Sequence, residues 1–169
     1  LKVADPPGNR EELKAFVQAN PGRFTLDMHF TGLTFLKALL IDIAGGQEAL
    51  AGDFEEEKYE QYSAELWAYL KEIQPYLWRE GKTFPEAVAP MHQLFASGEL
   101  WFTMSNNDCE VDNKILQGVF PSSARAYVPE MGTIQNTHYM GIASRASNVA
   151  GAMVVANFLI SPEAQWKKM

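Results

Sequence analysis

The sequence predicts an α/β fold, and three observations lead to this prediction. Segments with helical apolar periodicity alternate along the chain with short runs typical of strands, which is the order found in α/β proteins. The run Leu100–Met104 is almost entirely apolar, as in a strand buried on both faces. Between Gly132 and Ile160 a strand-like segment, a short turn and an apolar helix follow one another directly.

The first elements are a helix and a strand. Asn9 is followed three residues later by Glu12, a pattern typical of a capping box, and it predicts a helix to about Ala19. Asn20-Pro21-Gly22 ends this helix. The alternation from Arg23 to Met28 is weak but predicts the first strand.

Two longer helices follow. After the connection His29–Gly32, apolar residues recur at helical spacing up to Ile43, and Gly45-Gly46 then stops the helix. The segment Glu55–Ile73 carries aromatic and aliphatic residues near the 3.6-residue period and predicts a second helix, which Pro75 closes.

The middle of the chain predicts a turn, a helix and a buried strand. Trp78–Gly81 is expected to form the turn, and Thr83 with Glu86 predicts a helix start, with the helix running to Ser97. The apolar run 100–104 is the predicted strand. It ends in Ser105-Asn106-Asn107-Asp108, residues that favour turns.

The last third predicts two more strands and three helices. A helix is expected at 108–116, and strands at 124–128 and 137–143. Ser147 is the expected N-cap of a helix from Val149 to Ile160. Pro162 suits the first turn of the final helix.

The helix expected at 149–160 is apolar on nearly every side, since Asn157 is its one polar side chain. A helix of this kind must be covered on nearly every side. It does not reach the roughly 20 apolar residues that cross a bilayer.

Composition excludes some function classes. The formal charge is −7, whereas a nucleic-acid partner calls for a basic surface, so we expect no nucleic acid to bind. Cys109 is the single cysteine, which excludes an internal disulfide and leaves the redox compartment open. The start of the chain does not resemble a signal peptide.

Several motifs resemble one known family. The most telling is Ser161-Pro162-Glu163-Ala164-Gln165 after an Ala-rich helix. Asn20–Phe24, Thr31-Gly32 before a Phe35-Leu36 helix, Trp78–Pro85 and Leu94–Glu99 match further motifs in the same order. Together they resemble the extracellular solute-binding proteins of ABC importers, family 1, of the type 2 periplasmic class. Trp101 and Phe102 depart from the pattern, because smaller or acidic residues are expected there.

The resemblance implies one lobe of a type 2 periplasmic-binding-protein-like fold, a mixed sheet flanked by helices. Residues 1–144 would form lobe 2, which faces the ligand cleft, and residues 145–169 would be the return helices that re-enter lobe 1. The resemblance therefore implies a missing lobe 1 of the same polypeptide, with the export signal upstream. Without that lobe, we expect the chain either to self-associate through the Val149–Ile160 helix or to pack that helix back on its own lobe.

The candidate ligand-binding residues follow from strand ends and from the resemblance. Ligands of α/β sheets bind outside the carboxyl ends of strands, where Thr31, Ser105 and Asn106 would lie on one rim with converging side chains. Each candidate also has a plain structural interpretation: an N-cap for Thr31 and Gly32, a core aromatic for Trp78, and turns for the Ser and Asn residues. The candidates are Thr31, Gly32, Trp78, Ser105, Asn106, Asn107 and Asn136.

No catalytic or metal-binding pattern is visible in the sequence. His29, His92 and His138 do not form a metal-ligand spacing, and no nucleophile elbow or phosphate loop occurs. We therefore expect no catalytic residue, no metal and no cofactor.

The resemblance implies a periplasmic or lipid-anchored extracellular protein that captures a small solute in an interlobe cleft and delivers it to a membrane ABC permease. The alternative is the ligand-sensing domain of a transcription regulator with the same fold. An enzyme is disfavoured because no catalytic constellation is present. The sequence does not select the solute.

Overall fold

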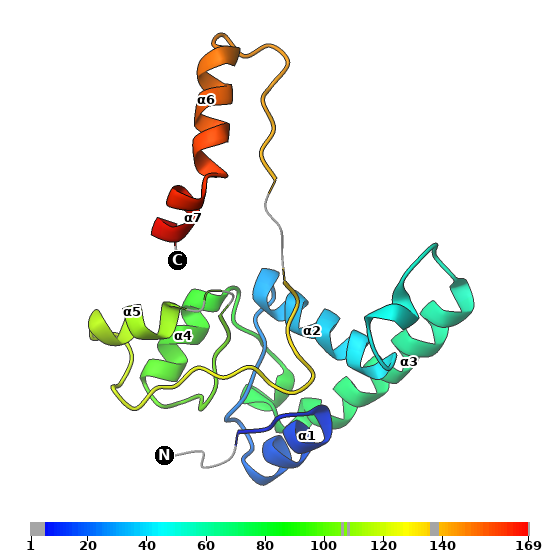
Figure 1. Cartoon of the computed structure of the whole chain (residues 1–169). Helices are drawn as coiled ribbons and strands as arrows, with labels where there is room; N and C mark the ends of the chain where they lie inside the picture. Colours follow the sequence, from blue (N-terminus) through cyan, green and yellow to red (C-terminus); the bar gives the residue numbers. More distant parts are fainter. Residues whose placement is uncertain (1–5, 106, 108, 136–138, 169) are drawn as a thin grey trace. The chain divides into compact units, whose positions relative to one another are not determined.

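The computed structural model describes residues 6–105, 107, 109–135 and 139–168, and the chain divides into two compact units, Leu1–Ile134 and Gln135–Met169. Figure 1 labels the helices of each unit. The first unit contains α1 (Arg10–Ala19), α2 (Phe30–Ile43), α3 (Glu56–Ile73), α4 (Val88–Ala96) and α5 (Glu110–Leu116), with the short 3-10 helices η1 (Gln47–Leu50), η2 (Gln74–Tyr76) and η3 (Trp78–Gly81). The second unit contains α6 (Val149–Leu159) and α7 (Pro162–Lys168).

The predicted mixed sheet is wrong, because the described residues form no strand. The segment 23–28 makes single backbone bonds to three other segments: Arg23 O accepts from Trp101 N at 2.9 Å, Phe24 O from Trp78 N at 2.9 Å, and Met28 N donates to Pro85 O at 3.0 Å. A ladder needs repeated bonds between the same two segments. These bonds tie the segments together without forming a sheet.

The other predicted strands fail for the same reason. Segments 100–104, 124–128 and the described part of 137–143, residues 139–143, carry no strand assignment, and no repeated pairing joins them to another described segment. Residues 137 and 138 of the last predicted strand lie outside the described residues. The short apolar runs have strand-like composition, but a strand requires a partner in register, which the local sequence does not supply.

The N-terminus of α1 confirms the predicted capping chemistry. Asn9 is the N-cap, and its Oδ1 accepts a hydrogen bond from Glu12 N at 3.0 Å. The Glu12 carboxylate reaches back one residue further than expected and accepts from Gly8 N at 2.8 Å. Two amides at the helix start are therefore satisfied by side chains.

The helix expected from Thr83 begins at Val88 instead. Pro90 explains the shift: a start at Thr83 would place this proline inside the helix, where it removes a hydrogen bond and clashes with the preceding turn. A start at Val88 puts Pro90 in the first turn, where proline is tolerated.

Two other helix starts also differ slightly from the sequence prediction. The N-cap of α6 is Asn148 rather than Ser147, since Asn148 Oδ1 accepts from Gly151 N at 2.8 Å. The helix expected after the His29–Gly32 connection already begins at Phe30.

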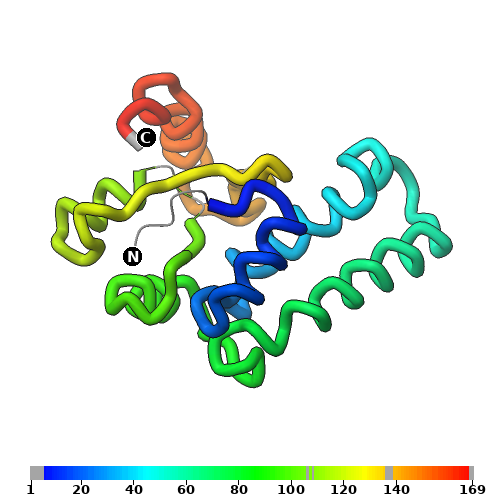
Figure 2. Tube along the Cα trace, turned by 90° about the horizontal axis from the view of Figure 1, so that it is seen from below, coloured from blue at the N-terminus to red at the C-terminus, as the bar shows by residue number. Residues whose placement is uncertain are grey.

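The core of the first unit lies where α1, α2 and α3 meet. Leu13, Val17, Leu39 and Ile73 are buried there together with Phe24 from the irregular segment. Figure 2 shows α1 beside α3, and the Tyr69 hydroxyl of α3 donates to Arg10 O of α1 at 2.8 Å. These contacts fix the segment 23–28, which leads into α2, against the helices.

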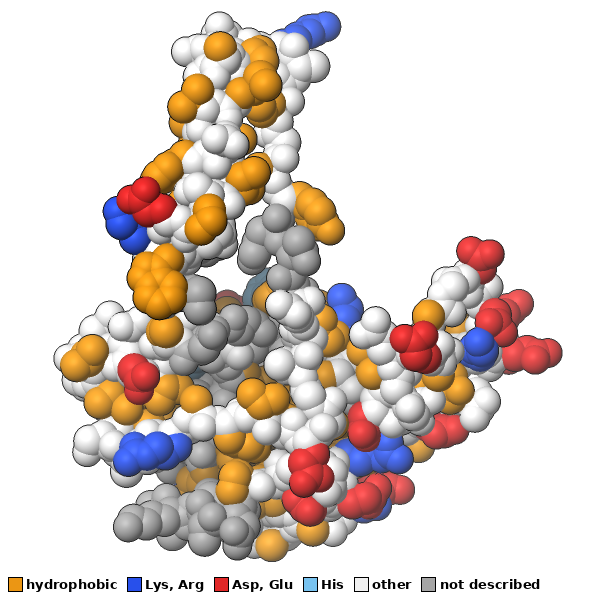
Figure 3. All heavy atoms as spheres, in the orientation of Figure 1, with side chains coloured by type: hydrophobic (Ala, Val, Ile, Leu, Met, Phe, Trp, Pro, Cys, Tyr) orange, Lys and Arg blue, Asp and Glu red, His pale blue; other side chains and the backbone are white. Residues whose placement is uncertain are grey.

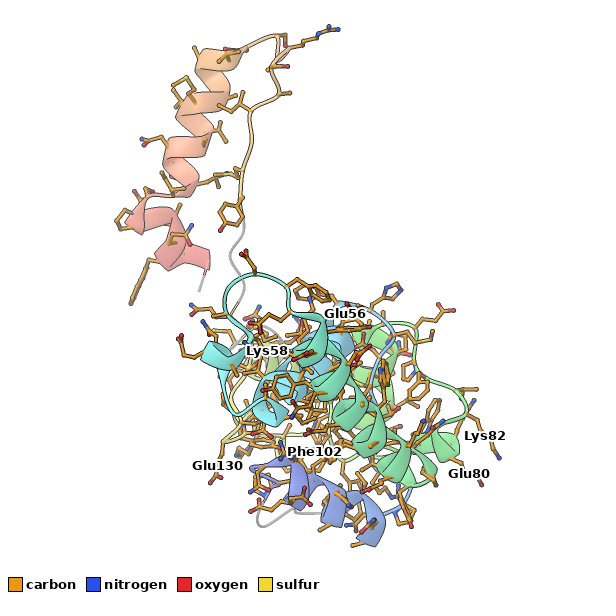
Figure 4. The ribbon with its side chains drawn as sticks, turned by 90° about the vertical axis from the view of Figure 1, so that its right-hand side faces the viewer. Glu56, Lys58, Glu80, Lys82, Phe102 and Glu130 are labelled. Carbon is orange, nitrogen blue, oxygen red and sulfur yellow. The ribbon has the colours of Figure 1, made fainter. Side chains whose placement is uncertain are left out.

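Acidic residues gather before and at the start of α3, and their side chains are exposed. Figure 3 shows acidic side chains over the end of the first unit where α3 begins. Glu48, Asp53, Glu55, Glu56, Glu57 and Glu60 are all exposed. Figure 4 labels Glu56 and Lys58 there, and Lys58 pairs with Glu55 at 2.6 Å.

Candidate functional site

The first turn of α2 holds two of the predicted ligand-binding residues. Thr31 and Gly32 are the second and third residues of the helix, and Thr31 is 8% exposed. Leu33 N donates to the carbonyl of His29 across one turn at 2.9 Å. The amides at the start of a helix have no partner within the helix, so this end can attract an acceptor.

Asp27 stands at this helix end. Its Oδ1 accepts from His29 N at 2.8 Å, and His29 is the N-cap residue of α2. The second carboxylate oxygen, Oδ2, is buried and has no hydrogen-bond partner among the described residues. Asp27 therefore contributes a negative charge close to Thr31 in the chain, and the sequence prediction did not include it.

The backbone of Asp27 passes so close to Gly32 that it leaves no room for a side chain there. A Cβ at this position would lie 2.0 Å from Asp27 O and 2.9 Å from Asp27 C. Real Cβ atoms do not approach backbone atoms so closely, so only glycine fits here without moving Asp27. Gly32 thereby allows the segment 23–28 to pass directly over the first turn of α2.

Apolar side chains beside this turn are exposed. Met28 is 64%, Phe30 57% and Leu33 54% exposed. A surface of this kind next to a helix start suits a ligand with both an apolar and a polar part.

The candidates Ser105 and Asn107 lie in a segment whose backbone amides are hydrogen-bonded by its own side chains. Asn107 N donates to Ser105 Oγ at 3.0 Å, and Cys109 N donates to Asn107 Oδ1 at 3.0 Å. These are consecutive turns closed by side chains two residues back. Ser105 and Asn107 are exposed, so the turn presents polar atoms at the surface.

The Ser105 side chain bonds to the carboxylate of Glu110, which in turn lies near the ring of His92. Ser105 Oγ donates to Glu110 Oε2 in the first turn of α5. Glu110 Oε1 lies 3.7 Å from His92 Nδ1, and the His92 side chain is only 6% exposed. The other ring nitrogen, Nε2, is 3.1 Å from Met104 O.

Trp78 lies in a smaller core cluster with Met91 and Leu100 and is 8% exposed. Its Nε1 donates to Glu99 Oε1 at 2.6 Å, and the Arg79 guanidinium lies 4.2 Å from its ring centroid. The structure therefore gives Trp78 the packing role that was its plain interpretation. Stacking on a ligand stays a prediction.

Two candidates, Asn106 and Asn136, lie outside the described residues. The prediction that Thr31, Ser105 and Asn106 converge on one rim therefore stays a prediction. The segments that precede Thr31 and Ser105 do meet, through the Arg23–Trp101 bond and through the rings of Phe24 and Phe102, whose centroids are 6.4 Å apart.

Other kinds of site receive no support from the described part of the chain. No group of three or more His, Cys, Asp or Glu side chains could hold a metal ion there. None of the helices within the described ranges is both long and apolar enough to cross a membrane. A hollow of about 480 Å³ lies within the second unit between residues 140–146 and α6, and its lining is largely apolar.

The sequence analysis missed Asp27, His92 and Glu110. Asp27 lies two residues before His29, the N-cap of α2. Acidic residues near a helix N-terminus are favoured, so this position could have been noticed in the sequence. The pairing of His92 with Glu110 joins two helices, and no local pattern reports it.

Comparisons with known proteins give a consistent result. The family model described as "Bacterial extracellular solute-binding protein" matches residues 1–169. A curated relative, "Protein YnjB" of Escherichia coli (strain K12), is 39% identical over 165 residues, which cover 96% of this chain and 42% of the relative. The chain thus spans less than half the length of that protein. No solved structure matches significantly.

Proposed function

Because this chain belongs to the bacterial extracellular solute-binding protein family, we propose that it is part of a receptor that captures a small solute and delivers it to an ABC permease in the membrane. The observation that carries the proposal is the family match, which extends over the whole chain, residues 1–169. The role is one of binding rather than catalysis, and its place is the periplasm or the outer face of the cell membrane.

The proposed contacts with the solute come from the two polar surfaces described above. The first turn of α2, with Thr31 and Gly32, offers amide donors and a hydroxyl. The Ser105 turn offers the hydroxyl of Ser105 and the side-chain amide of Asn107. Asn106, which lies outside the described residues, belongs to the set because the resemblance assigns it. Asn136 and Trp78 complete the set as the resemblance assigns it. Support comes from the exposure of Ser105 and Asn107 and from the exposed apolar side chains around Thr31.

We propose that a further part of the polypeptide completes the cleft and covers α6. The relative is more than twice as long as the stretch that this chain matches, since that stretch is 42% of its length. In α6 the side chains of Met153, Val154 and Phe158 are 59%, 70% and 51% exposed, as expected of a helix that packs against a missing partner. Residues 145–169 would then be the return helices of the two-lobe arrangement.

The experiment is solute capture by the full-length protein. Native mass spectrometry of the protein purified under mild conditions should show a small molecule bound at one equivalent, and titration calorimetry should then measure its affinity. Absence of any bound solute, and of any binding in a broad panel of sugars, amines, cofactors and anions, would contradict the proposal.

Thr31→Val tests the site, because it removes the hydroxyl and keeps the shape. We expect the affinity for the captured solute to fall about tenfold, the loss typical of one hydrogen bond. Thr34→Val is the matched control. Thr34 is also buried in α2 and is not one of the candidate residues. Its Oγ1 donates to Phe30 O of the same helix at 2.7 Å, so we expect its loss to leave the affinity unchanged.

A further inference from the structure

His92 is a buried residue of α4, and its ring contacts the residues that flank the Ser105 turn. Its ring packs edge-on against Phe120, with centroids 5.3 Å apart, and its residue exposure is 5%. A buried imidazole normally has both nitrogens engaged. Here Nε2 faces the Met104 carbonyl at 3.1 Å, and Nδ1 faces the Glu110 carboxylate at 3.7 Å.

The carbonyl partner of Nε2 assigns one proton to the ring. A carbonyl oxygen only accepts, so Nε2 must carry a proton and donate it to Met104 O. In a neutral imidazole Nδ1 would then present a lone pair to a carboxylate, which also only accepts. The contact becomes favourable when Nδ1 is protonated too and the imidazolium pairs with Glu110.

Glu110 links the protonation of His92 to the Ser105 turn, because its two carboxylate oxygens face the two residues. Its Oε1 faces His92, and its Oε2 accepts from Ser105 Oγ. The same Ser105 Oγ accepts from Asn107 N, and Asn107 Oδ1 accepts from Cys109 N. A carboxylate held by His92 thus orients the hydroxyl from which the turn is built.

We propose that His92 is a positioning residue for the solute-binding turn: acting through Glu110, its protonated ring holds Ser105 and Asn107 in the conformation that meets the solute. That the turn binds solute rests on the proposed function. That His92 stabilises the conformation of the turn does not. Among the described residues, Glu110 from α5 is the one charged group paired with His92, α4 itself carries no charged side chain, and the 119–124 segment contributes the Phe120 ring.

Amide hydrogen exchange in the full-length protein tests the proposal without any ligand. Protection of the Asn107 and Cys109 amides, corrected for intrinsic exchange, is measured at pH 5.5 and pH 8.5, on either side of the range in which imidazoles lose a proton. We expect protection at the lower pH to be about tenfold greater, because an imidazolium 3.7 Å from Glu110 favours the carboxylate to which Ser105 Oγ donates. Equal protection at both pH values would overturn the proposal.

Three variants separate positioning from plain packing. His92→Gln keeps a donor for Met104 O and removes Nδ1, and Glu110→Gln keeps an acceptor for Ser105 and removes the charge. Both should lose the pH dependence. Asp112→Asn, an exposed acid on the same helix, should behave as the wild type. A pH dependence that persists in His92→Gln or Glu110→Gln would sink the assignment.

The outcome is separable from that of the proposed function. A pH-dependent turn with no solute captured would refute the receptor role alone. A receptor whose turn shows no pH dependence would refute the role of His92 alone.

Discussion

The backbone carbonyl oxygen of Asp27 lies 2.0 Å from the point that a Cβ on Gly32 would occupy. Gly32→Ala must therefore move either the segment 23–28 or the start of α2. Because the obstructing atom is backbone rather than the end of a flexible side chain, we expect the free energy of unfolding to fall by about 2–3 kcal/mol, the upper part of the range for overpacked sites. Urea unfolding followed by circular dichroism measures it.

Gly141→Ala is the matched control for this substitution. Apart from its chain neighbours, no heavy atom of a described residue lies within 4 Å of a Cβ built at Gly141, and its φ is outside the left-handed region. The stability of this variant should therefore stay within about 0.5 kcal/mol of wild type. Equal stability of the two variants would contradict the close contact.

Trp78 provides a second test, because a core residue and a ligand-stacking residue respond differently to substitution. With 8% exposure and a bonded Nε1, Trp78→Ala should lower the free energy of unfolding by about 3–5 kcal/mol. The matched control is Trp67→Ala, since Trp67 on α3 is 55% exposed and should cost little. Thermal unfolding of the ligand-depleted protein is the measurement. A Trp78→Ala variant of wild-type stability would restore stacking on the solute as its main role.

Local signals in the sequence predicted the helices well. The Asn9 cap and the 3.6-residue period of 56–73 involve neighbours along the chain, and both appear in the structure. The sheet could not be predicted in this way. Segment 23–28 has the composition of a strand, but it bonds to three different segments, so its conformation is decided by tertiary contacts.

The same distinction applies to the candidate site. Ser105 and Asn107 were expected in a turn because their side chains can bond to amides two residues ahead, and they do so. The partnership of His92 with Glu110 depends on how α4 packs against α5, and so does its effect on Ser105. Residues of this second kind are found only once the helices are placed.

Tyr127 predicts a loss of stability at high pH. Burial raises the pKa of Tyr127 from 10.0 to about 12, and its hydroxyl donates to Pro7 O at 3.3 Å. The folded state thus favours the neutral phenol. Its contribution is complete below pH 10 and is lost as the pH rises through about 12. Because the residue is 43% exposed, we expect a loss of only about 1 kcal/mol, after allowing for solvent screening.

Tyr127→Phe isolates this contribution. The variant should be slightly less stable than wild type at pH 7, where it lacks the hydrogen bond, and should match or exceed wild type near pH 11.5. Tyr139→Phe, at a residue 89% exposed, is the control. Urea unfolding at both pH values measures the difference, and parallel losses in the wild type and Tyr127→Phe would count against it.

The apolar surface of α6 predicts how the 169-residue chain behaves in isolation. Val154 is 70%, Phe158 51% and Ile160 69% exposed. Figure 3 shows hydrophobic side chains gathered over this helix. Exposed apolar patches larger than a few hundred Å² tend to find a partner. We therefore expect the isolated chain either to self-associate through α6 or to pack α6 back on its own lobe. If a further lobe covers the helix, as proposed above, the full-length protein should remain monomeric.

Val154→Lys places a charge in the middle of this apolar surface. Because burying an unpaired ammonium is costly, the association of the isolated chain should weaken by at least tenfold. Gln165→Lys adds the same charge at an exposed polar position of α7 and should leave association unchanged. Sedimentation equilibrium over a range of concentrations distinguishes the two variants. A wild-type chain that stays monomeric at high concentration, with α6 still exposed to solvent, would show that the exposed side chains of α6 need no cover, and equal association of both variants would place the contact elsewhere.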